Sequence, residues 1–406
     1  MSFTLEVEWS SAEQIPSPLK DTAADLTIIA NNPAWTQNID HWSKSLRRST
    51  RVSLHPLAMW FATYWWRQRF EPQTTDHGLQ SPQWRLAHDM PGAGMGYVWP
   101  DIRIASDSER IVLSAWSRPG AAWETAWYLL DPSPASLTVP ITAFDREVGG
   151  FIALVIERLK ACRAPDAALE ALWQTIQAER GDPEVAAWRS LGARLGYDAD
   201  QAPEPLIEQL DQLGHTIGDS ARDELAPIIG SDYPKDVLAT IEAVAGSRGV
   251  DANPAELGLL DGTSMSRTSP VERGRELAAS TRKNLRLDDR ALRDVDIERL
   301  LGIPHASLQL APPIERAPIA LAVRGDAGGQ AHLHFRRRNP PGRRFEAARF
   351  LGEFLTADKA DRWLPQTDTA SARQKFQRAF AAEFLAPIAA LDDYLAKDFS
   401  AGRLER

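Results

Sequence analysis

The sequence predicts an α+β protein built in three consecutive parts. Residues 1–145 contain mainly strand patterns, residues 146–265 contain helix patterns, and residues 266–406 combine helices with a pair of strands. Apolar residues make up 43% of the chain and charged residues 25%, which is typical of folded globular proteins. A chain of 406 residues is long enough for two or three domains, so we expect more than one hydrophobic core.

Tryptophan sets the first part apart, because eleven of the 14 tryptophans precede residue 130. Residues 3–9 alternate apolar and polar side chains, as a half-buried strand does. Further strand-like runs occur at residues 25–30, 50–54, 97–105 and 110–116. Residues 55–70 carry Pro56 in a first turn and then apolar side chains at helical spacing. We expect a small antiparallel sheet with one helix packed on it.

Two tryptophan pairs in this first part have two interpretations. Trp65 and Trp66 are adjacent on the predicted helix, and Trp123 and Trp127 are four residues apart. Tryptophans of this kind can line a ligand groove or a protein interface. Burial in a core between sheet and helix is the commoner outcome. Because Trp65 and Trp66 do not share a helix face, at least one of them is expected near an edge.

The middle and last parts are mainly helical. Gly, Pro and Asp separate the helices of the middle part, but no fixed period repeats, so the sequence does not predict a solenoid. Ser269 followed by Pro270 predicts the start of a helix. Two strands are predicted at 317–325 and 330–336, and two closing helices at 343–357 and 371–396. The segment 261–270 is the best predicted linker.

Charge and cysteine content exclude several classes of protein. The net charge of −9 argues against broad binding to nucleic acids or anionic membranes. The single cysteine, Cys162, excludes internal disulfides and a cysteine-rich zinc site. No apolar run approaches the roughly 18–20 residues of a membrane span, and the N-terminus has no secretory signal pattern. We therefore expect a cytoplasmic protein.

Several short motifs resemble a known family. Arg343, Arg344 and Phe345 open the first closing helix, Leu351 and Gly352 lie in its middle, and the second helix carries FAAEFLAP at 380–387. With the upstream stretch 271–285 and the strand pair, residues 266–406 resemble the ImmA/IrrE family of metallopeptidase-like proteins. The resemblance implies a zincin-like fold for this part. Segments 55–66 and 84–90 resemble the extension of a long, tryptophan-rich subgroup of the same family.

The resemblance also implies where a zinc site would lie, and this sequence departs from it. The family pattern carries His-Glu-x-x-His on the first helix, where two imidazoles hold zinc and the glutamate polarises a metal-bound water. A third, acidic ligand comes from the second helix. These four positions hold Arg349, Phe350, Glu353 and Phe376 here. One carboxylate does not hold zinc, so we expect no catalytic residues and no cofactor.

The replacements suggest how the former site is filled. Arg349 and Glu353 are one helical turn apart, so we expect them to form an ion pair. Phe376, Phe380 and Phe384 form a stripe at helical spacing, which is typical of packing into a core. We therefore expect a pseudoenzyme in which an apolar contact, sealed by an ion pair, takes the place of a metal pocket.

The resemblance implies a regulatory or scaffold role, in a bacterial stress response or in phage defence, exerted through contacts with a protein partner. One alternative is an active zinc peptidase with displaced ligands. His332 and His334 are the closest histidine pair, and on a strand both imidazoles would share a face and reach one metal. No third ligand is apparent near them, and such pairs are usually ordinary surface or half-buried residues.

A second alternative is a sensor of anions or nucleic acid. Five arginines flank the turn at 339–342, namely Arg336, Arg337, Arg338, Arg343 and Arg344. Clustered guanidinium groups bind phosphates and acidic protein faces. The other interpretation is a solvated turn that leads into a helix, and the negative net charge of the chain favours it.

Overall fold

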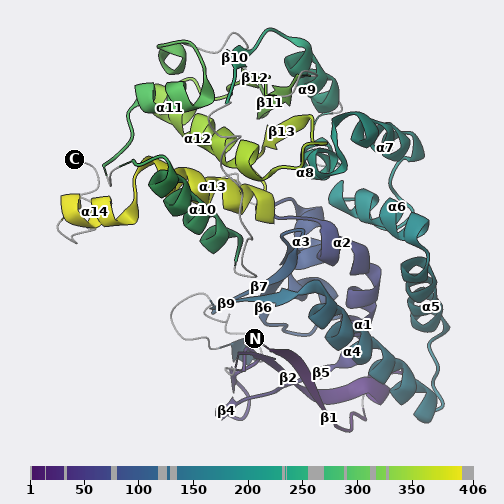
Figure 1. The fold of residues 1–406 in the computed structure, drawn as a ribbon. Helices are drawn as coiled ribbons and strands as arrows, with labels where there is room; N and C mark the ends of the chain where they lie inside the picture. Colours follow the sequence, from purple (N-terminus) through teal and green to yellow (C-terminus); the bar gives the residue numbers. More distant parts are fainter. Residues whose placement is uncertain are drawn as a thin grey trace. The chain divides into compact units, whose positions relative to one another are not determined.

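The computed structural model divides into two compact units (Figure 1). Unit 1 comprises Met1–Ile207 and Gly230–Asp232, and unit 2 comprises Glu208–Ile229 and Tyr233–Arg406. The structure describes residues 2–13, 15–31, 34–74, 80–117, 126–128, 135–230, 234, 236–254, 269–287, 290–310, 317–325 and 329–395. Helices and antiparallel strands are both present, which confirms the general α+β class.

Unit 1 contains three small antiparallel sheets. The first has the order β1 (Phe3–Trp9), β2 (Ala23–Ala30), β5 (Thr50–Ser53). The second has the order β6 (Asp101–Ser106), β7 (Arg110–Trp116), β9 (Ala135–Pro140). The third has the order β4 (Ser45–Arg47), β3 (Asn38–Asp40), β8 (Ala126–Tyr128). The strands predicted at 3–9 and 110–116 are confirmed at both ends.

The helices of unit 1 differ from the expectation in two places. The helix predicted over 55–70 is interrupted at Tyr64, whose backbone (φ −102°, ψ 19°) leaves the helical region. The helices are α1 (Leu54–Thr63), α2 (Trp65–Phe70), α3 (Pro82–His88), α4 (Ile141–Ala161), α5 (Ala167–Gly181) and α6 (Pro183–Arg194). Helix α4 crosses the boundary expected at 145, because Phe144, Val148 and Phe151 all belong to the core of unit 1.

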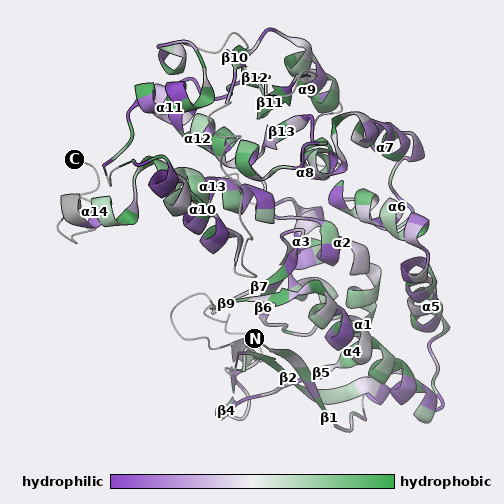
Figure 2. Cartoon of the chain, in the orientation of Figure 1, coloured by the Kyte–Doolittle hydropathy of each residue, from purple (hydrophilic) through white to green (hydrophobic). Residues whose placement is uncertain are grey.

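Five tryptophans of unit 1 are buried in its hydrophobic core. Those buried in it are Trp35, Trp60, Trp65, Trp66 and Trp99. Trp65 and Trp66 are thus both buried, and Trp123 lies outside the described residues. Figure 2 shows both hydrophilic and hydrophobic residues along α5, whereas strands β6 and β7 carry apolar residues. In accordance, only Leu169, Ile176 and Glu179 of α5 are buried.

Unit 2 contains a four-stranded antiparallel sheet. Its order is β10 (Val250–Ala252), β12 (Ala331–His334), β11 (Ala320–Arg324), β13 (Trp363–Gln366). Strands β11 and β12 confirm the predicted strand pair. The helices are α7 (Glu204–Ile217), which begins in unit 1, α8 (Asp219–Ile229), α9 (Val237–Gly246), α10 (Pro270–Asn284), α11 (Asp294–Leu301), α12 (Pro340–Thr356), α13 (Ala372–Leu385) and α14 (Ile388–Leu395). Short 3-10 helices occur at Lys20–Thr22, Met90–Ala93 and Ser307–Gln309.

The helix starts and stops of unit 2 follow local sequence signals. Ser269 caps α10 as expected, and Glu272 completes a capping box by accepting from the Ser269 backbone N–H. The helix predicted over 371–396 ends instead at Leu385, because Ala386 is extended (φ −148°, ψ 93°) and precedes a proline. The predicted linker lies outside the described residues as far as residue 268.

Helices α10 and α13 pack closely around a glycine. A Cβ on Gly274 would lie 2.6 Å from the Phe376 carbonyl oxygen and 2.9 Å from the Phe380 backbone nitrogen. Phe376, Phe380 and Phe384 are buried and stack in sequence, with 5.2 Å between the ring centroids of the last two. This confirms the expected core stripe on α13. None of the described helices is long and apolar enough to cross a membrane.

Candidate functional site

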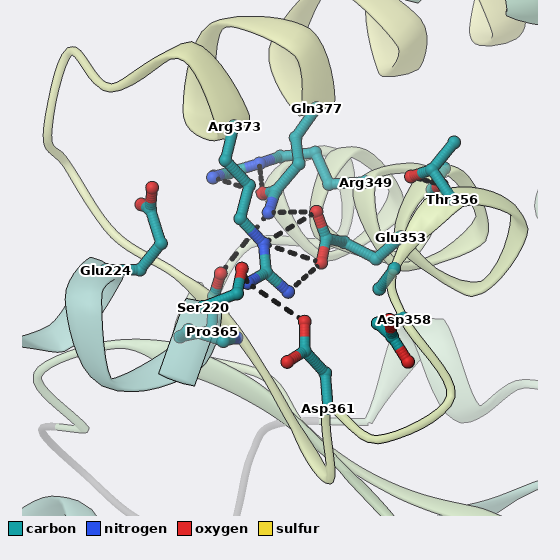
Figure 3. Close-up of polar contacts among 12 residues, drawn as sticks. Ser220, Glu224, Arg349, Glu353, Thr356, Asp358, Asp361, Pro365, Arg373 and Gln377 are labelled. Carbon is teal, nitrogen blue, oxygen red and sulfur yellow. Dashed lines mark hydrogen bonds and ion pairs between the residues drawn. The ribbon is translucent and has the colours of Figure 1, made fainter. Parts of the chain in front are cut away.

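The candidate site of unit 2 is a buried polar network between α12 and α13 (Figure 3). Arg349 and Glu353 project from α12, and their exposed fractions are 5% and 1%. Gln374 and Gln377, on the facing helix α13, are fully buried. Helical spacing places Arg349 and Glu353 one turn apart on the same face, so both meet α13.

Hydrogen bonds occupy both carboxylate oxygens of Glu353. The Nε of Arg373 donates to Oε2 at 2.9 Å and to Oε1 at 3.1 Å, and its Nη2 also donates to Oε2. The Nε2 of Gln377 donates to Oε1 at 2.7 Å. A forked pair of this kind is among the strongest charge-assisted contacts in proteins. Glu353 is therefore held by two donors from the facing helix.

The Arg373 guanidinium joins several segments of unit 2 (Figure 3). Its Nη1 donates to the Ser220 hydroxyl of α8 at 2.8 Å and lies 3.5 Å from Oδ2 of Asp361. Burial opposes the charged form, but the neighbouring Glu353 carboxylate outweighs it and holds the pKa of Arg373 above its ordinary value. Arg373 therefore stays protonated and acts as the cation of the network.

Two further carboxyl groups surround this cation. Burial raises the pKa of Glu224 and of Asp361, even though the Arg373 charge acts in the opposite direction. Glu224 accepts hydrogen bonds from the Ser371 hydroxyl at 2.8 Å and from Nε2 of Gln374 at 3.0 Å. Helix α8 thus supplies one wall of the network.

The ion pair expected between Arg349 and Glu353 does not form. Arg349 donates through Nε and Nη2 to Oε1 of Gln377, at 3.1 and 2.8 Å, and also to Gln374. Burial lowers the pKa of Arg349 to about 9. Gln377 therefore bridges the two residues, since it accepts from Arg349 and donates to Glu353. Arg373 is the better partner, because Arg before Glu at this spacing is the weaker orientation within one helix.

The expectation of an apolar contact at this position needs only a partial correction. The residues of α13 that meet Arg349 and Glu353 are polar, but the phenylalanine stripe lies beside them, since a Cβ on Gly352 of α12 would lie 2.9 Å from the Phe380 ring. Phe350 and Phe376 belong to the hydrophobic core of unit 2. Phe350 makes an edge-to-face contact with Phe335 at 6.0 Å between ring centroids. The contact between α12 and α13 therefore contains an apolar part and, beside it, a polar network.

The zinc ion that the resemblance implies does not fit these residues. Two of the four family positions are phenylalanines and one is a buried arginine, none of which ligates zinc. The fourth, Glu353, is engaged by Arg373 and Gln377. Across the described parts of the chain, no group of three or more His, Cys, Asp or Glu side chains could hold a metal ion.

The two histidines of β12 have separate surroundings. His332 is exposed, and its Nδ1 lies 2.8 Å from Oδ1 of Asp251 on the neighbouring strand. His334 is buried, with Nδ1 3.4 Å from the Ser247 hydroxyl and with Nε2 lacking a hydrogen-bond partner. Burial lowers the pKa of His334 to about 4. His334 is therefore a neutral, buried residue at physiological pH.

The arginine-rich turn is mostly engaged within unit 2. Arg336 pairs in a forked arrangement with Asp368, Arg343 is buried and donates to the Leu308 carbonyl at 2.8 Å, and Arg344 pairs with Asp294. The remaining two, Arg337 and Arg338, are exposed. Asn339 caps α12 through the Gly342 N–H. The geometry thus corresponds to the structural interpretation of a turn that leads into a helix.

The sequence interpretation missed Arg373, Gln374 and Gln377. One spacing signal was present, since Arg373 and Gln377 are four residues apart and lie on the side of α13 that also carries Phe380 and Phe384. No local signal identified Glu224 or Ser220, because about 150 residues separate them from α13 along the chain.

No family model, no curated protein and no solved structure matches this chain.

Proposed function

We propose that the chain is a non-catalytic, metallopeptidase-like protein that acts by binding another protein. The observation that carries this proposal is the state of Glu353, whose two oxygens accept hydrogen bonds from Arg373 and Gln377. Peptide hydrolysis by a zincin needs a metal-bound water and a carboxylate free to polarise it. Phe350 stands at the position of that carboxylate, and Glu353, at the second histidine position, is already engaged by a guanidinium and an amide.

Rearrangement to a metal-binding state would be costly. A metal ion on Glu353 would displace Arg373, whose side chain is only 14% exposed. The Arg373 guanidinium would then have Asp361, at 3.5 Å, as its nearest carboxylate. Gln377 would lose its acceptor at the same time. Breaking a buried ion pair typically costs about 3–5 kcal/mol. This argument weighs against the alternative of a peptidase with displaced ligands.

A hairpin of unit 1 supports the part of the proposal that concerns a protein partner. Trp42, in the turn between β3 and β4, is 94% exposed, and Leu46 on β4 is 63% exposed. Folded proteins seldom expose a tryptophan so fully, and tryptophan is enriched among residues that dominate binding energy at interfaces. A sensor of nucleic acid has less support, since Arg336, Arg343 and Arg344 already have partners in unit 2.

The cellular setting belongs to the same proposal. A cytoplasmic regulator or scaffold in a bacterial stress response or in phage defence is what the ImmA/IrrE resemblance implies. The resemblance rests on residues 266–406 and on two segments of the first part. Partner capture from the native cells tests it, with the full chain compared with a Trp42→Ala/Leu46→Ser variant. We expect one protein at near-equal amounts with the wild type and much less with the variant. Recovery of the chain alone in both cases would count against a protein partner.

A cleavage assay tests the non-catalytic part. The purified full chain, supplied with zinc, is incubated with a peptide library, and the products are compared with those of Glu353→Gln by mass spectrometry. We expect the same background for both proteins, because neither has a free carboxylate beside a metal. Cleavage by the wild type that a chelator abolishes, and that Glu353→Gln lacks, would refute the proposal.

A further inference from the structure

A pocket within unit 1, separate from the network of unit 2, combines aromatic and acidic side chains. Its volume is about 270 Å³. Three of the residues that line it are aromatic, namely Trp66, Trp188 and Tyr197. Three others are acidic, namely Asp198, Asp200 and Glu204. This volume lies just below the usual range of ligand pockets, about 300–1,000 Å³, so it suits only a small ligand.

Internal contacts fix the walls of the pocket. The Trp66 indole N–H donates to Oε2 of Glu179 at 2.8 Å, which orients a ring that is only 5% exposed. The Asp198 carboxylate accepts from Nη1 of Arg67 at 2.9 Å. Gly192 of α6 allows close packing of the segment before α7, because a Cβ there would lie 3.3 Å from the Ala202 Cβ. The pocket is thus held in shape without a ligand.

The charges around the pocket favour a cation. Arg189 also lines it, but two carboxylates neutralise this guanidinium, with Glu179 at 2.6 Å and Asp200 at 2.6 Å. Glu204, the first residue of α7, has no ion-pair partner among the described residues. Negative charge therefore exceeds positive charge at the lining, which opposes an anionic ligand.

We propose that this pocket binds a small organic cation of the methylated-ammonium class. Aromatic rings attract such cations through their quadrupoles, and methylated ammonium groups are the usual ligands of aromatic cages. A divalent metal is a poorer fit, because it requires several oxygen ligands converging at about 2–2.6 Å. A ligand that enters from solvent meets Trp188, whose exposed fraction is 37%. Trp188 supplies the aromatic contact, and Glu204 supplies the acidic one.

This binding is independent of the proposed function, since the lining includes neither Trp42 and Leu46 nor any residue of the polar network of unit 2. It also gives Trp66 a role at the edge of the core, which is one of the two interpretations of the Trp65-Trp66 pair. The ligand would be a small molecule or a methylated side chain of a protein. These two sources share the ammonium chemistry, and choline and a trimethyl-lysine peptide distinguish them.

Isothermal titration of the full chain tests the proposal, with choline and a trimethyl-lysine peptide as probes and 3,3-dimethylbutan-1-ol as the uncharged isostere of choline. We expect at least one of the two cations to bind and the isostere not to bind. Trp188→Ala should weaken binding by about 2- to 30-fold, the range expected for one cation–π contact. Trp188→Phe should retain most of the affinity, and Leu154→Ala, which changes an exposed side chain outside the pocket lining, should leave it unchanged.

Three results would overturn the proposal. The first is an equal affinity for choline and its uncharged isostere, because the pocket would then be merely apolar. The second is an unchanged affinity in Trp188→Ala, which would place the ligand elsewhere. The third is the absence of heat with either cation at about 10 mM, where even a millimolar dissociation constant would be detected.

Discussion

Arg373→Met removes the cation of the buried network while keeping most of the side-chain volume. The substitution deletes the forked contact with Glu353, the hydrogen bond to Ser220 and the ion pair with Asp361. Glu353, with an exposed fraction of 1%, is then left with Gln377 as its donor. The variant thus converts a paired buried carboxylate into one without a cation.

The expected loss follows from this burial. Removing one partner of a buried ion pair typically destabilises a protein by about 3–5 kcal/mol. Because Gln377 still donates to Glu353, we expect Arg373→Met to lower the free energy of unfolding by about 3 kcal/mol. The double variant Glu353→Met/Arg373→Met removes both charges, so its loss should be smaller, about 1–2 kcal/mol. The double variant should therefore be about 1–2 kcal/mol more stable than Arg373→Met.

Urea unfolding at pH 7 measures these differences. Far-UV circular dichroism reports the helices of both units, whereas 13 of the 14 tryptophans precede residue 208, so fluorescence mainly reports unit 1. We expect the dichroism transition of Arg373→Met to give a lower free energy of unfolding than the wild type. The double variant should recover part of this difference. A loss below about 1 kcal/mol in Arg373→Met, or an equal loss in both variants, would refute the role assigned to the pair.

Three other substitutions test two separate features of the structure. Burial lowers the pKa of His334 to about 4, so protonation of this side chain favours the unfolded chain. The free energy of unfolding should therefore fall by about 3 kcal/mol as the pH drops from 6.5 towards 4, and above pH 6.5 this loss should be absent. Urea unfolding at pH 7 and pH 5 measures this pH dependence, and His334→Gln should remove it. The same difference in unfolding free energy between the two pH values in His334→Gln would show that other groups cause it. Gly274→Ala should destabilise by about 1–3 kcal/mol in thermal unfolding, because its Cβ would meet the backbone of α13. Gly150→Ala, with open space around its Cβ, should gain about 0.5–1 kcal/mol, and equal effects at the two glycines would contradict the close packing of α10 on α13.

Periodic patterns made the helices and the apolar core predictable. The phenylalanine stripe at Phe376, Phe380 and Phe384 predicted a buried face of α13, because a spacing of four residues repeats on one side of a helix. Ser269 with Glu272 marked the start of α10, since capping depends only on neighbouring residues. Strands of three residues, such as β3 and β4, show no detectable alternation, so they were missed.

The partners of buried charges were not predictable from local spacing. The i, i+4 rule paired Glu353 with Arg349, but the facing helix supplies Arg373, which is 20 residues away in sequence and reaches both oxygens. The same applies to Arg336 and Arg344, whose partners Asp368 and Asp294 lie 32 and 50 residues away. Such choices depend on how elements pack, and a single sequence contains no signal for that geometry.

Whether the polar network of unit 2 holds a metal is tested most directly by the zinc content of the purified full chain. The protein is equilibrated with zinc at neutral pH, dialysed and analysed by mass spectrometry of the elements, beside Glu353→Gln. We predict zinc far below one atom per chain in both proteins, because Arg373 and Gln377 occupy the Glu353 carboxylate. One zinc atom per wild-type chain, lost in Glu353→Gln, would contradict this prediction.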